Sequence, residues 1–326
     1  MGDPAGIGGE IALRVWAARR ETAPIFCIID DVARLVAIAE RFGIPCPVAS
    51  INSPDQAAAV FARALPVLRP EHPLTTPVAL GQPNPAAASA VIGAIDQAVA
   101  LAKRGAAAAI VTNPIHKAGL AGAGFAFPGH TEYLGHLAGG VDTVMMLAIE
   151  GLRVVPVTVH VAMKDVAQAL TTDAIVRCGR ITAAALKRDF GVAKPRLAVA
   201  ALNPHAGEKG IMGNEEMRII APAIAALNAD GIEANGPAPA DTLFHAAARS
   251  RFDAALCMYH DQALIPLKTL DFAGGVNVTL GLPFVRTSPD HGTAFDIASK
   301  GVADPSSLMA SLRMAAHIAE RRGNAA

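Results

Sequence analysis

Strand-like and helix-like segments alternate along nearly the whole chain, and this alternation restricts the possible folds more than any other feature. Residues 24–30 are expected to form a strand and residues 30–43 a helix that ends at a glycine. A long helix is expected over residues 86–105, followed by a strand over 106–114. Because repeated strand–helix units build mostly parallel sheets covered by helices, the sequence predicts an α/β fold.

Three of the expected strands lead directly into a histidine. The segments RVVPVTVH, RLAVAALNPH and DAALCMYH end at His160, His205 and His260. The carboxyl ends of strands in an open parallel sheet meet in one crevice, where ligands bind. Imidazole is a common protein ligand of zinc and similar metals, so the three histidines predict a metal site that a substrate completes. A hydrogen-bonded structural histidine is the alternative at each position taken alone.

Composition excludes several classes of partner. The chain has 326 residues, of which 52% are hydrophobic, and this is enough for a large core and two domains. Lys+Arg and Asp+Glu both total 28, so neither nucleic acid nor a membrane surface is indicated. No apolar run reaches the ~18 residues of a membrane span, and the first residues show no basic stretch followed by an apolar signal segment. We therefore expect a cytoplasmic protein with free thiols at Cys27, Cys46, Cys178 and Cys257.

Two helices in the second half have clear sequence boundaries. In TTDAIVRCGRITAAALKRDFG, Thr172 is the expected N-cap, Asp173 lies in the first turn and Gly191 follows the end. The next helix begins at Asn214, with two glutamates at the positive end of its dipole. Its expected core-facing stripe consists of Met217, Ile220, Ile224 and Leu227.

Polar residues at other strand ends and helix starts form a second group of candidates. His130 and Thr131 follow a glycine at a helix start, where they suit an anion, although Thr131 also fits a simple helix cap. Lys268, Asn277 and Arg286 come from three successive segments. Lysine and arginine together suit a phosphate or a carboxylate, so an anionic substrate is predicted.

Two carboxylates and a glycine-rich turn complete the candidates. Asp241, expected in a loop before a helix, and Asp261, beside His260, either orient metal ligands or take protons. A capping or solvated role is the alternative for both. The turn at residues 2–10 allows backbone amides to approach a ligand, although it is not a GxGxxG dinucleotide fingerprint.

Taken together, the motifs resemble a known enzyme family. GDPAGIG, NPIHK, GHTEYL, LNPHAGEKGIMGNEE, PADTLF, MYHDQ and VNVTLGLPFVRTSPDHGTAFD run from residue 2 to about residue 300 and are similar to those of the 4-hydroxythreonine-4-phosphate dehydrogenases of vitamin B6 biosynthesis. HGTAFDIA, followed by KGVADP, also resembles the cofactor loop of isocitrate and isopropylmalate dehydrogenases, which bind NAD(P) on a fold unlike the Rossmann domain.

The resemblance implies a fold and a domain organisation. Two α/β/α domains of the isocitrate/isopropylmalate dehydrogenase type are expected, with the active site in the interdomain cleft. Residues 1–120 and 270–326 would form a discontinuous cofactor-side domain, and residues 121–269 a metal- and substrate-binding domain that also dimerises. A homodimer with the active site at the subunit interface is implied.

The resemblance also implies a role for each matching residue. One divalent metal would be held by His160, His205 and His260. The phosphorylated substrate would be bound by His130, Thr131, Lys268, Asn277 and Arg286. The cofactor would lie against Gly6, Gly8, His291, Gly292, Thr293, Ala294 and Asp296. The candidates for the catalytic base, besides a water, are Lys268, Asp241 and Asp261.

The implied reaction is a metal-dependent, NAD- or NADP-linked oxidation of 4-phosphooxy-threonine. The β-keto acid product would decarboxylate to 3-amino-2-oxopropyl phosphate. Related dehydrogenases of threonate or erythronate 4-phosphate, or of dihydrodiol dicarboxylates, are the first alternative. A phosphate acyltransferase is more remote, since it needs neither the histidines nor the HGTAFD loop. Imidazole suits Zn²⁺, Co²⁺ or Ni²⁺, an open site also takes Mg²⁺ or Mn²⁺, and the choice between NAD and NADP stays open.

Two departures from the family pattern concern the start of the chain. Family members have a short strand before the GDPAGIG turn, and they have proline where Gly9 stands. An absent first strand would leave backbone groups of the neighbouring strand unpaired. We therefore expect that the numbered chain begins late relative to the natural protein.

Overall fold

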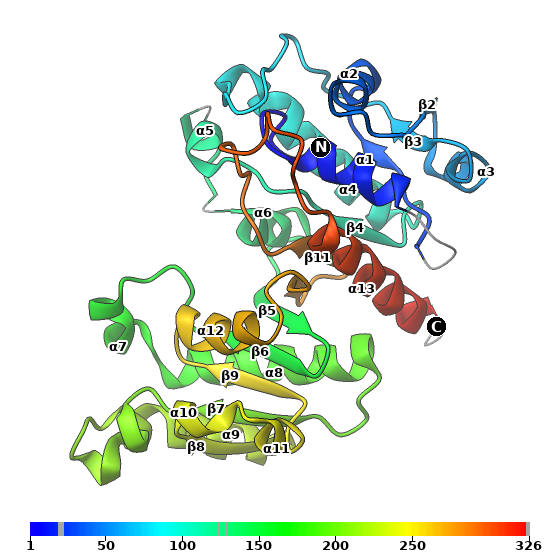
Figure 1. Cartoon of the computed structure of the whole chain (residues 1–326). Helices are drawn as coiled ribbons and strands as arrows, with labels where there is room; N and C mark the ends of the chain where they lie inside the picture. The colour runs from blue at the N-terminus through cyan, green and yellow to red at the C-terminus, as the bar shows by residue number, and fades with distance from the viewer. Residues whose placement is uncertain (19–22, 123, 128, 324–326) are drawn as a thin grey trace. The chain divides into compact units, whose positions relative to one another are not determined.

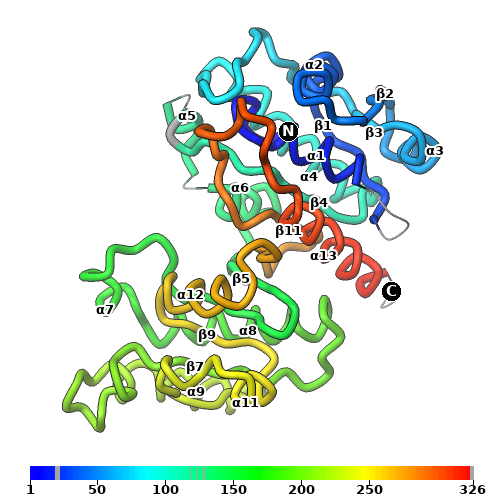
Figure 2. Tube along the Cα trace, in the orientation of Figure 1, coloured from blue at the N-terminus to red at the C-terminus, as the bar shows by residue number. Residues whose placement is uncertain are grey.

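The computed structural model describes residues 1–18, 23–122, 124–127 and 129–323, which form two compact α/β units. The first unit comprises Met1–Val141 and Leu282–Ala319, and the second comprises Asp142–Gly281 and Glu320–Ala326. Figure 2 follows this order by colour, from blue to green and again from orange to red in the first unit, and from green to orange in the second. The expected α/β class is present in both units.

The unit boundaries lie later than the expected positions at residues 120 and 269. Helix α6 (His130–Leu137) packs Tyr133 and Leu134 against Ile95 and Val99 of the first unit. Strand β10 (Val276–Leu280) pairs antiparallel with β5 (Val144–Ile149) of the second unit. These packing and pairing contacts set the unit boundaries. The sequence has no linker of distinctive composition at either boundary.

The first unit contains a three-stranded parallel sheet of order β1-β3-β2 and the two parallel strands β4 and β11. Its strands are β1 (Ile28–Ile29), β2 (Val48–Ile51), β3 (Leu65–Leu68), β4 (Ala109–Val111) and β11 (Val285–Pro289). Its helices are α1 (Gly8–Ala17), α2 (Val32–Phe42), α3 (Ala57–Phe61), α4 (Ala88–Lys103), α5 (Lys117–Gly122), α6 and most of α13 (Ser306–Gly323) (Figure 1).

Local signals explain how the elements of the first unit begin, end and pack. The side chain of Asp31 caps α2 by accepting from the Arg34 amide, and Gly43 ends this helix with a left-handed φ of 61°. Trp16 of α1 is buried, and its indole nitrogen donates to the Phe61 carbonyl. Within the described ranges, one helical stretch, Pro85–Lys103, is long and apolar enough to span a membrane, but 56% of it is buried as in a core helix.

The second unit is built on six strands in the order β10-β5-β6-β9-β7-β8. β5 is antiparallel to both neighbours, whereas β6, β9, β7 and β8 run parallel. The other strands are β6 (Leu152–Pro156), β7 (Arg196–Ala200), β8 (Glu233–Ala238) and β9 (Ala254–Cys257). The helices are α7 (Val166–Ala169), α8 (Thr172–Phe190), α9 (Ala221–Ala229), α10 (Ala240–Leu243), α11 (Ala246–Arg249) and α12 (His260–Leu270).

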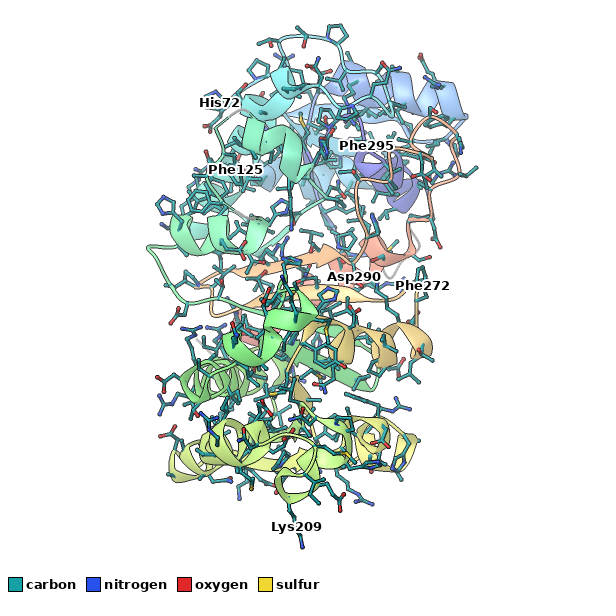
Figure 3. The ribbon with its side chains drawn as sticks, turned by 90° about the vertical axis from the view of Figure 1, so that its left-hand side faces the viewer. His72, Phe125, Lys209, Phe272, Asp290 and Phe295 are labelled. Atoms are coloured by element: carbon teal, nitrogen blue, oxygen red, sulfur yellow. The ribbon has the colours of Figure 1, made fainter. Side chains whose placement is uncertain are left out.

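Helices cover both faces of this sheet. Every residue of β9 is buried, as is typical of parallel strands enclosed on both sides. α12 packs Ala263 and Leu267 against Ala255 and Cys257, and Figures 1 and 3 show the strands between α12 and α8. All four cysteines are free thiols, three of them buried and Cys27 half-buried, as expected.

The ends of α8 match the expectation to within one residue. Gly191 ends the helix with a φ of 68°, and Asp173 lies in its first turn, both as expected. The N-cap is Thr171 and not Thr172: the Thr171 hydroxyl accepts from the Ala174 amide. Thr172 instead donates to the Ile219 carbonyl, so a tertiary contact decides between the two adjacent threonines.

The three strands that lead to histidines are neighbours in this sheet. β6 precedes His160, β9 precedes His260 and β7 precedes His205. β9 pairs in parallel with β6 on one side and with β7 on the other. Their carboxyl ends therefore lie together at one sheet edge, which confirms the topological prediction made from the three sequence segments.

Candidate functional site

His160 and His260 lie together at this sheet edge. Their ring centroids are 6.0 Å apart. Because an imidazole nitrogen binds zinc at about 2 Å, two rings that share one ion have centroids roughly 5–6 Å apart, so this pair fits a metal. His205 does not join them in a closed site: among the residues that the structure describes, no three His, Cys, Asp or Glu side chains form a group that could hold a metal.

The ring of His260 is oriented by the adjacent carboxylate. His260 Nδ1 and Asp261 Oδ1 are 2.6 Å apart, while Asp261 itself is exposed. A ring that donates from Nδ1 to a carboxylate keeps the lone pair on Nε2 for a metal. This contact fits the orienting role expected for Asp261. Asp241 lies in the first turn of α10 and not in a loop, because that helix already begins after Pro239.

His205 stands on an unusual backbone turn. Five consecutive residues, 205–209, have left-handed φ values between 41° and 75°, and four of them are not glycine. This conformation costs an L-residue about 1–2 kcal/mol, so surrounding contacts must stabilise the turn. Figure 3 shows Lys209 projecting outward from it. The turn therefore displays His205 at an exposed position after β7.

Two glutamates anchor the start of this turn. The carboxylate of the buried Glu216 accepts from the backbone amides of Leu202, at 2.9 Å, and Asn203, at 2.7 Å. The Asn203 side-chain amide donates to both Glu216 and Glu215, and its hydrogen bond lowers the pKa of Glu215. Both glutamates lie in the first turn of their helix, as expected, and they also stabilise the His205 turn through these hydrogen bonds.

Gly207→Ala is expected to destabilise this turn more than left-handed strain alone explains. Gly207 has a φ of 75°, and an added Cβ would lie 2.5 Å from Glu216 Oε2 and 2.9 Å from the Gly213 carbonyl. Strain at such a φ costs about 1–2 kcal/mol, and displacing the buried carboxylate adds about 1–3 kcal/mol. The free energy of unfolding from urea titration measures this loss.

Gly105→Ala is the matched control for that change. Its φ is 73°, and nothing lies within 4 Å of an added Cβ. Only the conformational strain is therefore expected at this position. Equal losses in the free energy of unfolding of the two variants would show that Glu216 does not stabilise the His205 turn.

Met217 is exposed, contrary to the core-facing stripe that includes it. Its relative exposure is 54%, whereas the rest of that stripe is buried, namely Ile220, Ile224 and Leu227. Glu216–Ile220 form a π-helical turn, which shifts the register of this face by one residue. Met217 joins Ile211 and Met212 in a group of exposed apolar side chains on the second unit.

The expected anion ligands of the first unit include the half-buried His130 and the buried Arg286. His130 begins α6, as expected, and Arg286 lies on β11 with an exposure of 3%. Burial and the nearby charges of Arg286 and Lys117 lower the pKa of His130 well below its ordinary value, so the ring is neutral. Burial also lowers the pKa of Arg286 to about 10, which leaves the guanidinium charged at neutral pH.

The remaining candidates for substrate binding are divided between the units. Thr131 follows His130 on α6 in the first unit. Lys268 on α12 and Asn277 on β10 belong to the second unit, where the Lys268 ammonium lies 5.4 Å from the Phe272 ring centroid. Asn277 Oδ1 is buried and has no hydrogen-bond partner within the described ranges, so it is a ready acceptor.

The two expected cofactor segments contact each other in the first unit. The Ile7 amide donates to the Thr293 carbonyl, and an added Cβ at Gly6 would lie only 2.8 Å from that oxygen. Glycine at position 6 therefore permits the close approach. Gly8 accepts from the side-chain amide of Asn113 beyond β4. The glycine-rich turn, the 291–296 loop and the end of β4 thus form one cluster.

This cluster offers polar atoms for a ligand. His291 Nδ1 contacts the Gly292 carbonyl at 2.9 Å, which leaves Nε2 as an acceptor. Asn113 Oδ1, His116 Nδ1 and His291 Nε2 are buried without hydrogen-bond partners in the part of the chain that the structure describes. Ala294 has a left-handed φ of 50°, while Gly292 and Asp296 are exposed. Buried unpaired polar atoms call for a ligand or water, so the cluster offers hydrogen-bonding groups to a polar ligand.

Sequence reasoning missed the buried polar residues behind the histidines. Glu216, Asn203, Thr158 and Gln262 are all buried or half-buried and hydrogen-bonded near the histidine-bearing strand ends. The contact of Gln262 could have been predicted from the sequence, because a glutamine in the first turn of a helix often forms a hydrogen bond to the chain before the helix. The other contacts depend on tertiary structure.

Comparison with known proteins gives a consistent result over the whole chain. The model of the family described as pyridoxal phosphate biosynthetic protein PdxA matches residues 21–315. The 4-hydroxythreonine-4-phosphate dehydrogenase of Caulobacter vibrioides is 56% identical over 328 residues, covering 99% of this chain and 97% of that protein.

Solved structures agree with this result. The crystal structure of 4-hydroxythreonine-4-phosphate dehydrogenase from Klebsiella pneumoniae matches with a TM-score of 0.86 and 40% identity, covering 98% of each chain. A terephthalate 1,2-cis-dihydrodiol dehydrogenase from Burkholderia xenovorans LB400 matches with a TM-score of 0.63 and 27% identity, covering 96% of this chain and 95% of that chain.

Proposed function

The chain belongs to the family of the pyridoxal phosphate biosynthetic protein PdxA, and from this membership we propose that it oxidises 4-phosphooxy-threonine with NAD or NADP. The product would be a β-keto acid that loses carbon dioxide to give 3-amino-2-oxopropyl phosphate. The observation that carries this proposal is the adjacency of three parallel strands that each lead to a histidine.

His160, His205 and His260 would hold one divalent ion, such as Zn²⁺, Co²⁺, Mg²⁺ or Mn²⁺. When bound, the ion lowers the pKa of the substrate hydroxyl and stabilises the negative charge that develops during decarboxylation. Asp261 would keep the His260 ring in its ligating orientation through the 2.6 Å contact. Asp241, Asp261 and Lys268 stay candidates for the group that removes the hydroxyl proton.

Arg286 would carry the main charge that binds the substrate phosphate. A guanidinium matches phosphate in charge and geometry, and the burial of Arg286 strengthens the attraction. The neutral His130 ring contributes a hydrogen bond without a second full charge. Thr131, Lys268 and Asn277 would complete the polar contacts to the substrate.

The cluster of residues 2–10 and 291–296 would bind the nicotinamide cofactor, which supplies the hydride acceptor. Gly6 and Gly8 let the turn pack closely against the Thr293 carbonyl and Asn113. His291 would offer its Nε2 lone pair to a cofactor hydroxyl. These contacts support the proposed roles of both segments.

We also propose a cytoplasmic homodimer with the active site at the subunit interface. Ile211, Met212 and Met217 are exposed on the second unit, with Ile211 at 81%. Apolar side chains gathered beside the His205 turn fit a protein–protein contact. A dimer would bury them and cover the turn that carries a proposed metal ligand.

A dihydrodiol dehydrogenase is the second candidate, favoured by the match at 27% identity to the Burkholderia xenovorans enzyme. The buried Arg286 favours a phosphorylated substrate instead. NADH formation should be measured side by side with 4-phosphooxy-threonine, phosphothreonate and terephthalate cis-dihydrodiol. The highest kcat/KM is expected with 4-phosphooxy-threonine, whereas formation of neither NADH nor NADPH from that substrate would refute the proposal.

A further inference from the structure

A cavity of about 420 Å³ lies at the amino ends of the strands that lead to the three histidines. It belongs wholly to the second unit. Leu152 and Arg196, which begin β6 and β7, line it, as does Asp253, which precedes β9. These parallel strands have four or five residues and rise about 3.3 Å per residue, so the cavity lies roughly 15 Å from their carboxyl ends. It is therefore separate from the proposed metal site.

Three arginines and one aspartate give this cavity its charge. Arg153, Arg196 and Arg249 contribute guanidinium groups, and Asp253 is the one acidic residue among the described residues that line it. The lining therefore carries two net positive charges, although the whole chain is neutral, with 28 basic and 28 acidic residues. A local excess of positive charge in a concave site attracts an anion.

The aspartate is already paired with one of these arginines. The Asp253 carboxylate accepts from Arg196 Nε at 3.2 Å, from Arg196 Nη2 at 3.1 Å and from the Arg196 backbone amide at 2.8 Å. Burial alone would raise the pKa of Asp253, but these hydrogen bonds outweigh burial and lower the pKa. The ionised carboxylate balances Arg196 and leaves Arg153 and Arg249 as the excess charge.

Arg153 is held in place while most of its donors stay available. Its guanidinium carbon lies 4.7 Å from the Phe190 ring centroid, and Nη1 donates to the Asp253 carbonyl at 3.2 Å. Within the described ranges this is the only hydrogen bond of its side chain, so its other N–H groups remain for a ligand. Burial lowers the pKa of Arg153, and the Asp253 charge opposes that shift only in part.

Arg249 has no partner for its guanidinium in the part of the chain that the structure describes. It ends α11, and its Nη1 lies 3.8 Å from the position of a Cβ added to Gly151, in the turn between β5 and β6. Its Nε is buried and forms no hydrogen bond among the described residues. A buried donor without a partner calls for a ligand or water. Arg153 and Arg249 together match the charge of a dianion.

We propose that this cavity binds the phosphate group of a small phosphorylated molecule. Guanidinium groups bind phosphate through charge-assisted hydrogen bonds, and a phosphate monoester carries nearly two negative charges at neutral pH. The volume lies in the range of small-molecule sites, so there is room for an organic part beside the phosphate. This site is additional to the substrate site proposed around Arg286 of the first unit and does not depend on it.

The test is isothermal titration of Arg286→Met with inorganic phosphate, in a buffer free of other oxyanions. This background lacks the main cation of the proposed substrate site, so the cavity accounts for the phosphate that binds. A second protein carries Arg249→Met as well. The matched control instead carries Arg251→Met, which removes an exposed arginine outside the cavity lining. Thermal unfolding checks that each protein is folded.

Adding Arg249→Met is expected to weaken phosphate binding by about 10- to 100-fold, because hydrogen bonds from a charged group are lost. Adding Arg251→Met should change the affinity by less than about twofold, since solvent and salt screen an exposed charge. Equal phosphate binding with and without Arg249 would overturn the inference and leave the substrate site at Arg286 standing.

Titration with glycerol 3-phosphate tests the organic part of the ligand. Because the cavity has room beside the phosphate, this ester is expected to bind at least as tightly as inorganic phosphate. Binding of inorganic phosphate with rejection of the ester would overturn the assignment to phosphorylated molecules.

Crystals of the wild-type protein soaked in tungstate, an analogue of phosphate, cover the case in which Arg286→Met does not fold. Anomalous density is expected between Arg153 and Arg249 and should be absent from crystals of Arg249→Met. Tungstate bound at other positions but not in the cavity would overturn the inference.

Discussion

Replacing His205 by alanine is expected to abolish tight metal binding and to lower kcat by at least about 10³-fold, because a site left with two protein ligands cannot retain the ion that activates the hydroxyl. The fold should persist, since the His205 side chain is exposed and the left-handed turn is anchored by Glu216 and Asn203. Metal content of the purified protein, NADH formation and thermal unfolding measure the three effects.

His245→Ala is the control for this variant. His245 is an exposed histidine of the same unit and lies before α11. It should keep wild-type metal content and turnover. Wild-type metal content and activity in His205→Ala would show that His160 and His260 share their ion with some other donor, and the three-histidine assignment would be wrong.

Arg286→Met is expected to raise KM for 4-phosphooxy-threonine by roughly 100-fold or more, which corresponds to about 3 kcal/mol or more of lost binding free energy. The reason is the burial of the guanidinium: its attraction for phosphate is weakly screened by solvent, unlike that of a surface cation. Methionine retains the length of the apolar stem, so the packing around β11 should persist. Steady-state kinetics and direct titration with inorganic phosphate measure the effect.

Arg104→Met tests whether any arginine of the first unit would give the same result. Arg104 is exposed at the end of α4. Its removal should leave KM within about twofold of the wild type, because solvent and salt screen exposed charges. A KM in Arg286→Met close to that of Arg104→Met would exclude Arg286 as the phosphate ligand.

Local patterns were sufficient to predict that the strands leading to His160, His205 and His260 end at one sheet edge. Each histidine lies just beyond a short apolar strand, and parallel strands joined by helices bring their carboxyl ends to the same side. The pairing of β9 with β6 and with β7 follows this rule. The contact of the 2–10 turn with the 291–296 loop was likewise consistent with the shared cofactor role that the resemblance implied.

Features set by tertiary contacts could not be predicted in this way. The left-handed turn at His205 depends on a carboxylate from a later helix, and no local propensity favours five such residues in a row. Met217 was misplaced because a π-helical turn breaks the 3.6-residue period. The unit boundaries followed the pairing of β10 with β5, which joins segments far apart in the sequence.

The most direct test of the central claim is NADH formation from 4-phosphooxy-threonine by the chelator-stripped protein, before and after one equivalent of Co²⁺ or Zn²⁺ per chain is added. The proposed function predicts no turnover without metal and restored turnover after the addition, with no restoration in His205→Ala. Full NADH formation by the metal-free protein would contradict a metal-dependent dehydrogenase centred on His160, His205 and His260.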